Sequence, residues 1–259
     1  MRRLLIGAMW IFVAVFLLLP IISIFAAALQ KGIMPYVHSL TDSDTLSAIR
    51  LTLIAALFAV SLNIIFGITA AWAITKYQFR GKGLLTVLID LPLSVSPVIS
   101  GMIFVLLFGA QSGLGRWLMD HGFNVIFSTP GIIITTIFIT FPIVARELIP
   151  VMESQGNDDE EAALTLGANG FQIFFKITLP KIKWALLYGL ILCNARAMGE
   201  FGAVSVVSGH IRGMTNTLPL HVEILYNEYN FVAAFACASL LVGLGLVTLA
   251  LKKLVELKL

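Results

Sequence analysis

Long apolar stretches constrain the fold of this chain more than any other feature of its sequence. A helix needs about 20 predominantly apolar residues to cross the hydrocarbon core of a bilayer, and such a segment must be helical because lipid offers its backbone groups no partners. The chain is 59% hydrophobic and only 12% charged, whereas soluble domains carry about 25% charged residues. We therefore predict an all-α membrane protein with six transmembrane helices. They are formed by Leu4–Leu29, Ile49–Thr75, Leu84–Ala110, Ile126–Ala145, Trp184–Val207 and Phe231–Leu251.

The first of these stretches also has the layout of a signal peptide, because Arg2 and Arg3 precede its apolar run. A signal peptide has an apolar region of roughly 7–15 residues, followed by a small-residue cleavage site. This run is longer and no such site stands out, so we predict that it stays in the membrane as a helix. With no internal repeat or low-complexity tract, we expect residues 1–259 to form a single transmembrane domain.

The positions of lysine and arginine indicate how the helices are oriented, because cytoplasmic loops carry an excess of both. A cytoplasmic N-terminus places twelve of the 17 basic residues inside, four outside and Arg196 within the membrane. We therefore predict that both termini are cytoplasmic. The inner set is Arg2, Arg3, Lys76, Arg80, Lys82, Arg146, Lys176, Lys181, Lys183, Lys252, Lys253 and Lys258, and the outer set is Lys31, Arg50, Arg116 and Arg212.

Motifs of common enzyme classes are missing from the sequence. It has no HExxH, GxSxG or GxxxxGK[ST] pattern, and the last of these is a loop that cradles nucleotide phosphates. The four histidines fall in predicted outer loops without the spacing of a metal site. Cys193 and Cys237 lie in apolar segments and indicate no disulfide framework. The sequence therefore predicts neither an enzyme nor a bound cofactor or metal in this chain.

The most polar stretch, Glu161–Pro180, lies on the predicted inner side. Asn157 or Asp158 is placed to cap a helix there, and the acidic residues that follow suit the positive end of its dipole. Gly167 is placed to end this helix with a positive φ. A second short helix follows, whose apolar residues, beginning with Phe171, can pack under the membrane helices. Such a helical finger favours docking on a partner, but an amphipathic loop lying on lipid headgroups fits the same composition.

Charged residues interrupt the fifth apolar stretch. Ionisable residues at membrane depth are rare and are functional hypotheses by default. Arg196 and Glu200 are four residues apart, and therefore on one helical face where they can pair. Arg196 either meets a transported anion or pairs internally with Glu200, and we favour pairing because an unpaired buried charge is costly.

Two prolines, Pro92 and Pro97, fall in the third apolar stretch and predict a kink in its helix. Ser94 and Ser96 lie between them. Their hydroxyl groups can satisfy carbonyls freed by the kink, which is the interpretation we favour. The alternative is that they coordinate a substrate, and hydroxyl groups at a helix break would bind an oxyanion without trapping it.

The Glu161–Pro180 stretch carries a specific spacing pattern. It reads EAA, three residues, G, nine residues, I, one residue, LP, and this pattern resembles the EAA loop of permease subunits in ABC importers. The resemblance implies the six-helix type I (MetI-like) permease fold, with residues 150–183 as a cytoplasmic loop that docks on a separate ATPase subunit. ATP and Mg would then be bound by that partner. The implied coupling residues are Glu161, Ala162, Ala163 and Gly167.

Three further runs extend the resemblance over nearly the whole chain: ARELIP, GEFGAVSVVSG and HIRGMTNTLPLHVEILYNEYN. They look like the sulfate/thiosulfate permeases of the CysW type from bacterial inner membranes. The resemblance implies a second permease of the CysT type, two ATPase subunits of the CysA type and a periplasmic sulfate- or thiosulfate-binding protein as partners, and no nucleic acid. Candidate translocation-path residues are Ser94, Ser96, Asn194, Arg196 and Glu200, and candidate contacts for the binding protein are His210, Arg212, Thr215 and Asn216.

Two alternatives to a sulfate permease remain at this stage. A molybdate or tungstate permease would share the EAA loop and the GEFG run, but the long outer loop after Ser208 disfavours it. An enzyme working within the membrane would use Arg196 and Glu200, and it would be active as the isolated chain.

Overall fold

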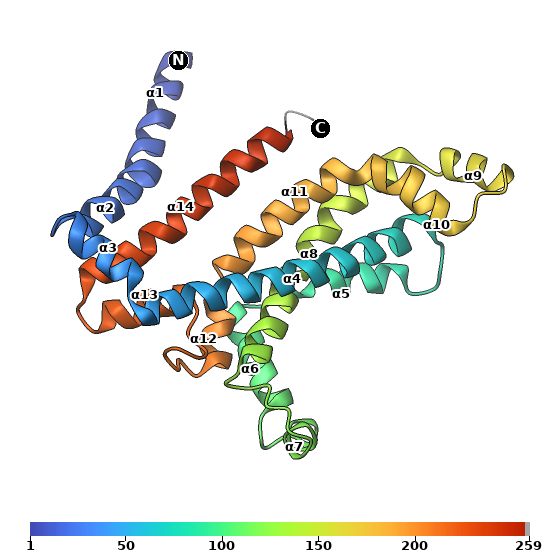
Figure 1. The fold of residues 1–259 in the computed structure, drawn as a ribbon. Coiled ribbons are helices and arrows are strands. Elements are labelled where there is room, and N and C mark those ends of the chain that lie inside the picture. Colours follow the sequence, from blue (N-terminus) through green and yellow to red (C-terminus); the bar gives the residue numbers. More distant parts are fainter. Residues whose placement is uncertain (257–259) are drawn as a thin grey trace. The chain divides into compact units, whose positions relative to one another are not determined.

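A computed structural model describes residues 1–256, and all of its regular elements are helices (Figure 1). These residues form two compact units. The first comprises Met1–Thr52 and His210–Leu246, and the second comprises Leu53–Gly209 together with the chain from Val247. Lys258, one of the basic residues predicted on the inner side, lies outside the described residues.

The first unit begins with one continuous helix built from α1 (Arg2–Val13), η1 (Ala14–Leu18) and α2 (Leu19–Ala28). It continues through α3 (Ile33–Thr41) into the start of α4, and it also holds α13 and most of α14. Its core packs Leu218 and Leu225 of α13 against Cys237 of α14. The bounds of the three helices that complete it are Ser43–Lys76 for α4, Leu218–Asn227 for α13 and Phe231–Glu256 for α14.

The second unit holds the rest of α4 and the helices from α5 to α12. One core cluster joins Ala71 of α4, Val144 and Leu148 of α8, and Ile182 and Ala185 of α11. The bounds of its helices are Lys82–Ser94 (α5), Pro97–Phe108 (α6), Gly113–Asp120 (α7), Thr129–Gln155 (α8), Asp158–Thr165 (α9), Gly170–Ile173 (α10), Phe174–Thr178 (η2), Leu179–Met198 (α11) and Gly202–Ser208 (α12).

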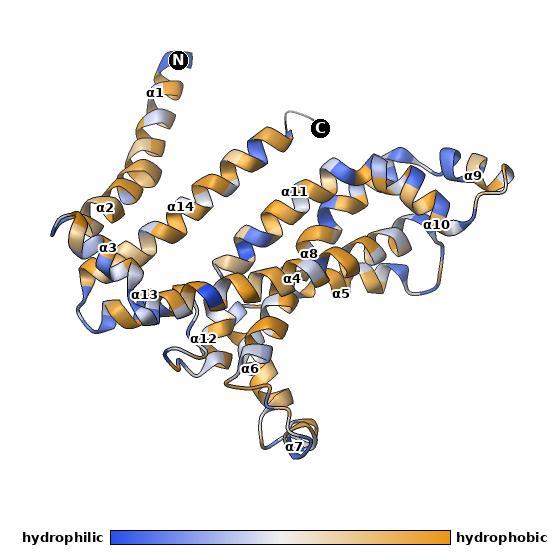
Figure 2. Cartoon of the chain, viewed as in Figure 1, coloured by the Kyte–Doolittle hydropathy of each residue, from blue (hydrophilic) through white to orange (hydrophobic). Residues whose placement is uncertain are grey.

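Within residues 1–256, four helices are long and apolar enough to cross a membrane, and counting each of two bent pairs as one span gives six. The four are Arg2–Ala28, Ser43–Lys76, Thr129–Gln155 and Phe231–Glu256. Figure 2 shows α4, α5 and α8 as mostly apolar, whereas hydrophilic residues gather at the start of α9. This arrangement agrees with the predicted all-α membrane protein.

The third predicted span is broken rather than kinked. Its halves α5 and α6 meet at 107°, so the prediction of a kinked helix was wrong in degree. Ser96, the residue before Pro97, has an extended backbone with φ −57° and ψ 135°, because a proline disfavours the helical conformation of its predecessor. Pro97 then begins α6, where its missing N–H costs nothing.

Two wide helical turns follow one sequence pattern. The π-helical segments η1 and η2 each contain five residues, and each is followed at once by a Leu-Pro pair, Leu19-Pro20 or Leu179-Pro180. Proline lacks an N–H and its ring crowds the carbonyl four residues earlier. A wider turn before the proline relieves that crowding at Pro20 and Pro180, whereas Pro92 lies inside α5 without such a turn.

Candidate functional site

The α9 helix and the turn after it form the centre of the predicted coupling loop. Helix α9 ends in a tight turn in which the N–H of Gly167 donates to Leu164 O at 3.0 Å and that of Ala168 donates to Ala163 O at 3.0 Å. Gly167 has φ +84°, a conformation that glycine adopts readily and other residues do not. The prediction that Gly167 ends the helix with a positive φ is confirmed.

The capping groups of this loop differ from the prediction. Asn157 occupies the N-cap position of α9, but its side chain makes no capping hydrogen bond. Its Oδ1 instead accepts from Lys76 Nζ at 3.0 Å, so the expected cap by Asn157 was wrong. A capping box forms instead at the start of α10, after the turn that ends α9. There the side chains of Asn169 and Gln172 each accept a hydrogen bond from the other residue's backbone N–H.

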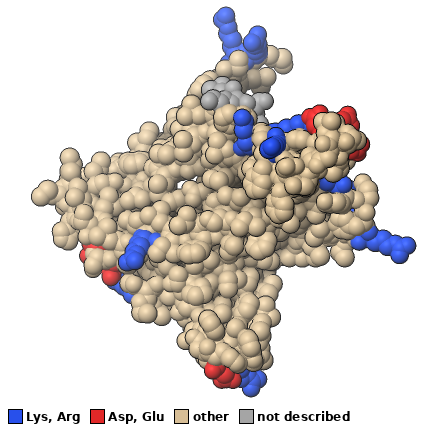
Figure 3. Space-filling view, turned by 45° about the vertical axis from the view of Figure 1, so that its right-hand side comes forward, with Lys and Arg blue, Asp and Glu red and all other residues tan. Residues whose placement is uncertain are grey.

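Apolar side chains project from the coupling loop. Glu161 and Ala162 are exposed, and so are Leu164 (58%), Leu166 (88%) and Phe171 (80%). The expected packing of the apolar residues after Gly170 is therefore wrong for Phe171, whereas Ile173 of the same set is buried. Figure 3 shows acidic and basic atoms gathered at a few places on a surface that is otherwise uncharged. Exposed apolar groups beside an acidic helix start are typical of a docking surface.

Asp159 and Lys181 form an ion pair at the edge of this loop. Their side chains are 63% and 33% exposed, respectively. The hydrogen bond and the positive charge of Lys181 lower the pKa of the Asp159 carboxyl below its ordinary value. Water and salt screen a pair this exposed, so it contributes little to stability.

A second group of predicted residues lies where α11 gives way to α12. Helix α11 ends at Met198, and Glu200 occupies the connection. Glu200 is 2% exposed, and its Oε1 accepts from the N–H of Ala203 at 2.9 Å. The carboxylate thus lies at the positive end of α12. The pairing of Arg196 with Glu200 is present, but it bridges the end of one helix to a break instead of lying on one helical face.

The two helix breaks lie against each other. A Cβ atom at Gly202, the first residue of α12, would lie 3.0 Å from Cβ of Pro97, the first residue of α6. One turn on, a Cβ atom at Gly101 would lie 2.6 Å from Ala203 O. Small residues allow this close approach of α6 and α12. The structure therefore brings the two breaks that hold the predicted path residues together.

The predicted path residues differ in exposure around these breaks. Ser94 and Ser96 are exposed. The hydroxyl group of nearby Ser100 donates to Ser96 O at 3.2 Å, a carbonyl that also accepts from the backbone N–H of Ser100 at 3.0 Å. Arg196 keeps 38% of its side chain exposed while it pairs with Glu200. Asn194 is half-buried, with Nδ2 lying 3.5 Å from Met198 Sδ. An exposed guanidinium and two exposed hydroxyl groups are chemically suited to an oxyanion.

Sequence reasoning missed a polar contact among three spans. Asn63 Nδ2 on α4 donates to Thr140 Oγ1 on α8 at 2.7 Å, and it lies 3.6 Å from Cys193 Sγ on α11. All three residues are fully buried. Polar side chains of this kind hold helices together inside membranes. The presence of Asn63 within the second apolar stretch was the sequence signal that could have revealed this contact.

The loop predicted to face a binding protein is partly folded inward. His210 and Arg212 keep 38% and 39% of their side chains exposed. Arg212 pairs with Glu228, and His210 Nδ1 lies 3.9 Å from Glu223 Oε2. Thr215 and Asn216 are only 3% and 2% exposed, so they stabilise the loop and are not available as surface contacts in this conformation. Within residues 1–256, no group of three or more His, Cys, Asp or Glu side chains is placed to hold a metal ion.

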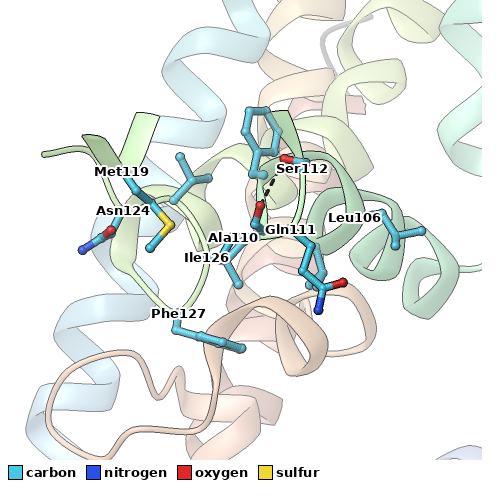
Figure 4. Close-up of a pocket in the computed structure, with 12 residues that line it drawn as sticks. Leu106, Ala110, Gln111, Ser112, Met119, Asn124, Ile126 and Phe127 are labelled. Carbon is cyan, nitrogen blue, oxygen red and sulfur yellow. Dashed lines mark hydrogen bonds between the residues drawn. The ribbon is translucent and has the colours of Figure 1, made fainter. Parts of the chain in front are cut away.

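A hollow of about 700 Å³ lies at the far end of α6, between this helix, α7 and the segment before α8 (Figure 4). Leu106, Met119 and Phe127 contribute apolar walls, and Gln111 and Asn124 contribute amides. Ser112 caps α7 by accepting from the N–H of Gly115 at 2.7 Å. The predicted path and coupling residues do not line this hollow.

Comparison with known proteins identifies the family. Residues 63–259 match the family described as "Binding-protein-dependent transport system inner membrane component". The chain belongs to this family. It is therefore a multi-pass inner-membrane permease component of an ABC transporter, which works with a binding protein and is not itself catalytic. The family uses no cofactor in this subunit.

Curated relatives of this permease cover nearly the whole chain. It is 50% identical to "Sulfate transport system permease protein CysW" of Escherichia coli (strain K12) over 97% of this chain and 87% of that one. It is 49% identical to the CysW protein of Synechocystis sp. over 98% and 92%. A more distant relative is the CysT permease of E. coli, at 34% identity over 94% and 88%.

Solved structures support the fold. The permease matches a chain in the crystal structure of a bacterial alginate ABC transporter, in complex with an alginate-bound periplasmic protein, with a TM-score of 0.78. The match covers 98% of this chain and 93% of that one at 19% identity. At this identity the likeness concerns the fold alone, which is that of an ABC importer permease.

Proposed function

We propose that this permease is one of two membrane subunits of an ATP-driven sulfate importer. The observation that carries the proposal is the 50% identity to the E. coli CysW protein over 97% of the chain. The 34% identity to the CysT protein supports a related second permease as its partner. Two ATPase subunits of the CysA type and a periplasmic sulfate-binding protein complete the proposed complex, which also accepts thiosulfate.

The proposed mechanism is alternating access driven through α9, which we call the coupling helix. With both termini in the cytoplasm, the coupling loop 150–183 faces the ATPase subunits. The exposed Glu161, Ala162 and Leu164 supply the docking surface, and the turn at Gly167 returns the chain towards α11. ATP binding brings the ATPase subunits together, the coupling helices move with them, and the membrane helices of the single permease domain reorient.

The anion path is proposed to pass the paired helix breaks. Arg196 keeps part of its guanidinium exposed, and Ser94 and Ser96 expose their hydroxyl groups. Asn194 and Glu200 complete the set, with Glu200 buried so that it orients Arg196 and caps α12. Because Glu200 neutralises part of the positive charge of Arg196, the guanidinium can attract a passing dianion without binding it tightly. On the outer side, His210 and Arg212 are the proposed contacts for the binding protein.

Uptake of labelled sulfate tests this function. The permease is expressed with its CysT-type partner, the ATPase and the binding protein in a strain that lacks its own sulfate importers. We expect ATP-dependent sulfate uptake that excess thiosulfate reduces and excess molybdate leaves unchanged. Uptake of molybdate without uptake of sulfate would overturn the substrate assignment, and activity of the isolated chain would favour the membrane enzyme instead.

A further inference from the structure

Lys76, the last residue of α4, places a largely buried side chain in a polar cluster at the start of the coupling helix. Its Nζ lies 2.6 Å from Gly156 O, 3.0 Å from Asn157 Oδ1 and 3.1 Å from Glu160 Oε2. A lysine ammonium group has three N–H donors, so each of them has an acceptor. The Lys76 side chain is only 8% exposed. The end of α4 is therefore attached to the residues that begin α9.

Glu160 extends this cluster to a third element. While its Oε2 pairs with Lys76, its Oε1 accepts from Thr178 Oγ1 of η2 at 2.7 Å. The Glu160 side chain is 16% exposed and Thr178 is 2% exposed. One carboxylate thus joins α4, α9 and η2. We call this arrangement the Lys76–Glu160–Thr178 clasp.

An aromatic contact supports the clasp from the neighbouring turn of α4. The rings of Trp72 and Phe174 stack with their centroids 5.0 Å apart and their planes at 22°. Residues four apart lie on the same face of a helix, so Trp72 and Lys76 face η2 together. The end of α4 therefore contacts η2 through stacked rings and reaches its Thr178 through the Glu160 carboxylate.

The clasp differs in kind from the other ion pair of the coupling helix. Asp159 and Lys181 are 63% and 33% exposed, and solvent competes readily for each of them. Breaking the clasp would leave a buried ammonium or carboxylate without its partner, which is strongly unfavourable. The Asp159–Lys181 pair can open during motion at little cost, whereas the clasp resists opening.

We propose that the clasp transmits movement of the coupling helix to α4. The chain itself links α9 to α8 and, through α10 and η2, to α11, but Lys76 lies 80 residues before Gly156. Lys76, Glu160 and Thr178 are positioning residues that make α4 move with the coupling helix. This inference rests on the proposed docking of α9 on an ATPase subunit, and it adds a third membrane helix to those that the docking drives.

The number of anions transported per ATP hydrolysed tests the clasp. The complete complex is reconstituted in proteoliposomes with its binding protein, and uptake and ATP hydrolysis are measured together. We expect Lys76→Ala to keep ATP hydrolysis but to lower the transport ratio about five- to tenfold, within the usual range of coupling between sites. Lys76→Arg, which keeps the charge and donors, should recover most of the ratio. Lys181→Ala is the matched control and should keep the wild-type ratio.

Milder variants keep the test decisive if Lys76→Ala prevents assembly. Glu160→Gln and Thr178→Val preserve side-chain volume and each removes one link of the clasp, so each should lower the ratio by a smaller factor. A wild-type ratio in Lys76→Ala, or in both milder variants, would overturn the clasp and leave the sulfate proposal standing. The ratio is measured with whichever oxyanion the wild-type complex transports, so a wrong substrate assignment does not affect the result.

Discussion

At the scale of single residues, His221 on α13 is a buried titratable group with two polar neighbours. It is 2% exposed. Its Nε2 lies 3.1 Å from Thr45 Oγ1, and its Nδ1 lies 3.4 Å from Asn216 Nδ2. Burial lowers the pKa of His221 below its ordinary value of 6.5. The carboxylates of Asp44, Asp42 and Glu228 oppose this effect, and nearby Arg212 adds to it. The folded protein therefore favours the neutral imidazole.

The pKa of His221 predicts a loss of stability in mild acid. Because the folded pKa lies below 6.5, the unfolded chain binds more protons in that range, and stability falls as the pH decreases below about 6.5. The full contribution is present above that pH. We expect the melting temperature of the detergent-solubilised protein to be lower at about pH 5.5 than at about pH 7.5.

Two variants isolate the contribution of His221 to this drop. His221→Gln should melt lower than the wild type at neutral pH, because it disturbs a buried site, but it should show a smaller acid-dependent drop. His38→Gln is the matched control, since His38 is exposed, and it should keep the wild-type pH dependence. An equal acid-dependent drop in His221→Gln and the wild type would contradict the assignment.

At this scale the sequence predicts residues whose role depends on their neighbours in the chain. Gly167 follows a helical pattern and Arg196 lies one turn from Glu200, so both predictions needed only local spacing. Lys76 gave no such signal, because its partner Glu160 is far along the chain and its burial arises from tertiary packing. The cap expected at Asn157 is absent for the same reason, since the Oδ1 atom of Asn157 accepts a hydrogen bond from Lys76 Nζ.

At the scale of helices, Gly101 of α6 and Gly202 of α12 determine how closely these two helices pack. A Cβ atom at Gly101 would lie 2.6 Å from Ala203 O, a backbone atom that cannot rotate away. Gly101→Ala must therefore push the helices apart, at a cost of about 1–3 kcal/mol for an overpacked site. Since the two helices carry the breaks next to the proposed path, we expect a lower melting temperature and slower uptake.

A helical glycine elsewhere provides the control for this substitution. Gly245 in α14 has no atom within 4 Å of a Cβ placed on it, and alanine favours a helix over glycine by about 1 kcal/mol. Gly245→Ala should leave the melting temperature unchanged or raise it. If Gly101→Ala melted like Gly245→Ala, the close approach of α6 and α12 would not matter for stability.

The spacing of apolar residues predicts where helices lie but not how sharply they break. Pro92 and Pro97 both predicted a kink, yet Pro92 stays inside α5 and Pro97 begins a new helix. After the break, α6 packs against α12, a contact between segments about 100 residues apart in the sequence that no local pattern reveals. The π-helical turns before Pro20 and Pro180 are equally hidden from local patterns, because the same Leu-Pro pair at Leu91-Pro92 lies inside α5 without such a turn.

At the scale of the whole molecule, the basic residues predict its orientation in the membrane. Twelve of the 17 lysines and arginines fall on the side predicted to be cytoplasmic. Positive residues are retained on the cytoplasmic side during insertion. The orientation decides which end of the permease meets an ATPase, so the proposed role of the coupling helix depends on it.

Labelling of introduced cysteines tests the orientation directly. Both native cysteines, Cys193 and Cys237, are fully buried, so a membrane-impermeant thiol reagent should react with an introduced cysteine alone. In intact spheroplasts, we expect labelling of Lys31→Cys, in the predicted outer loop, and none of Arg80→Cys until the membrane is permeabilised. The wild-type protein, with its two buried thiols, is the control. The opposite pattern would place α9 outside the cell, where no ATPase could bind it, and would remove the basis of the coupling mechanism.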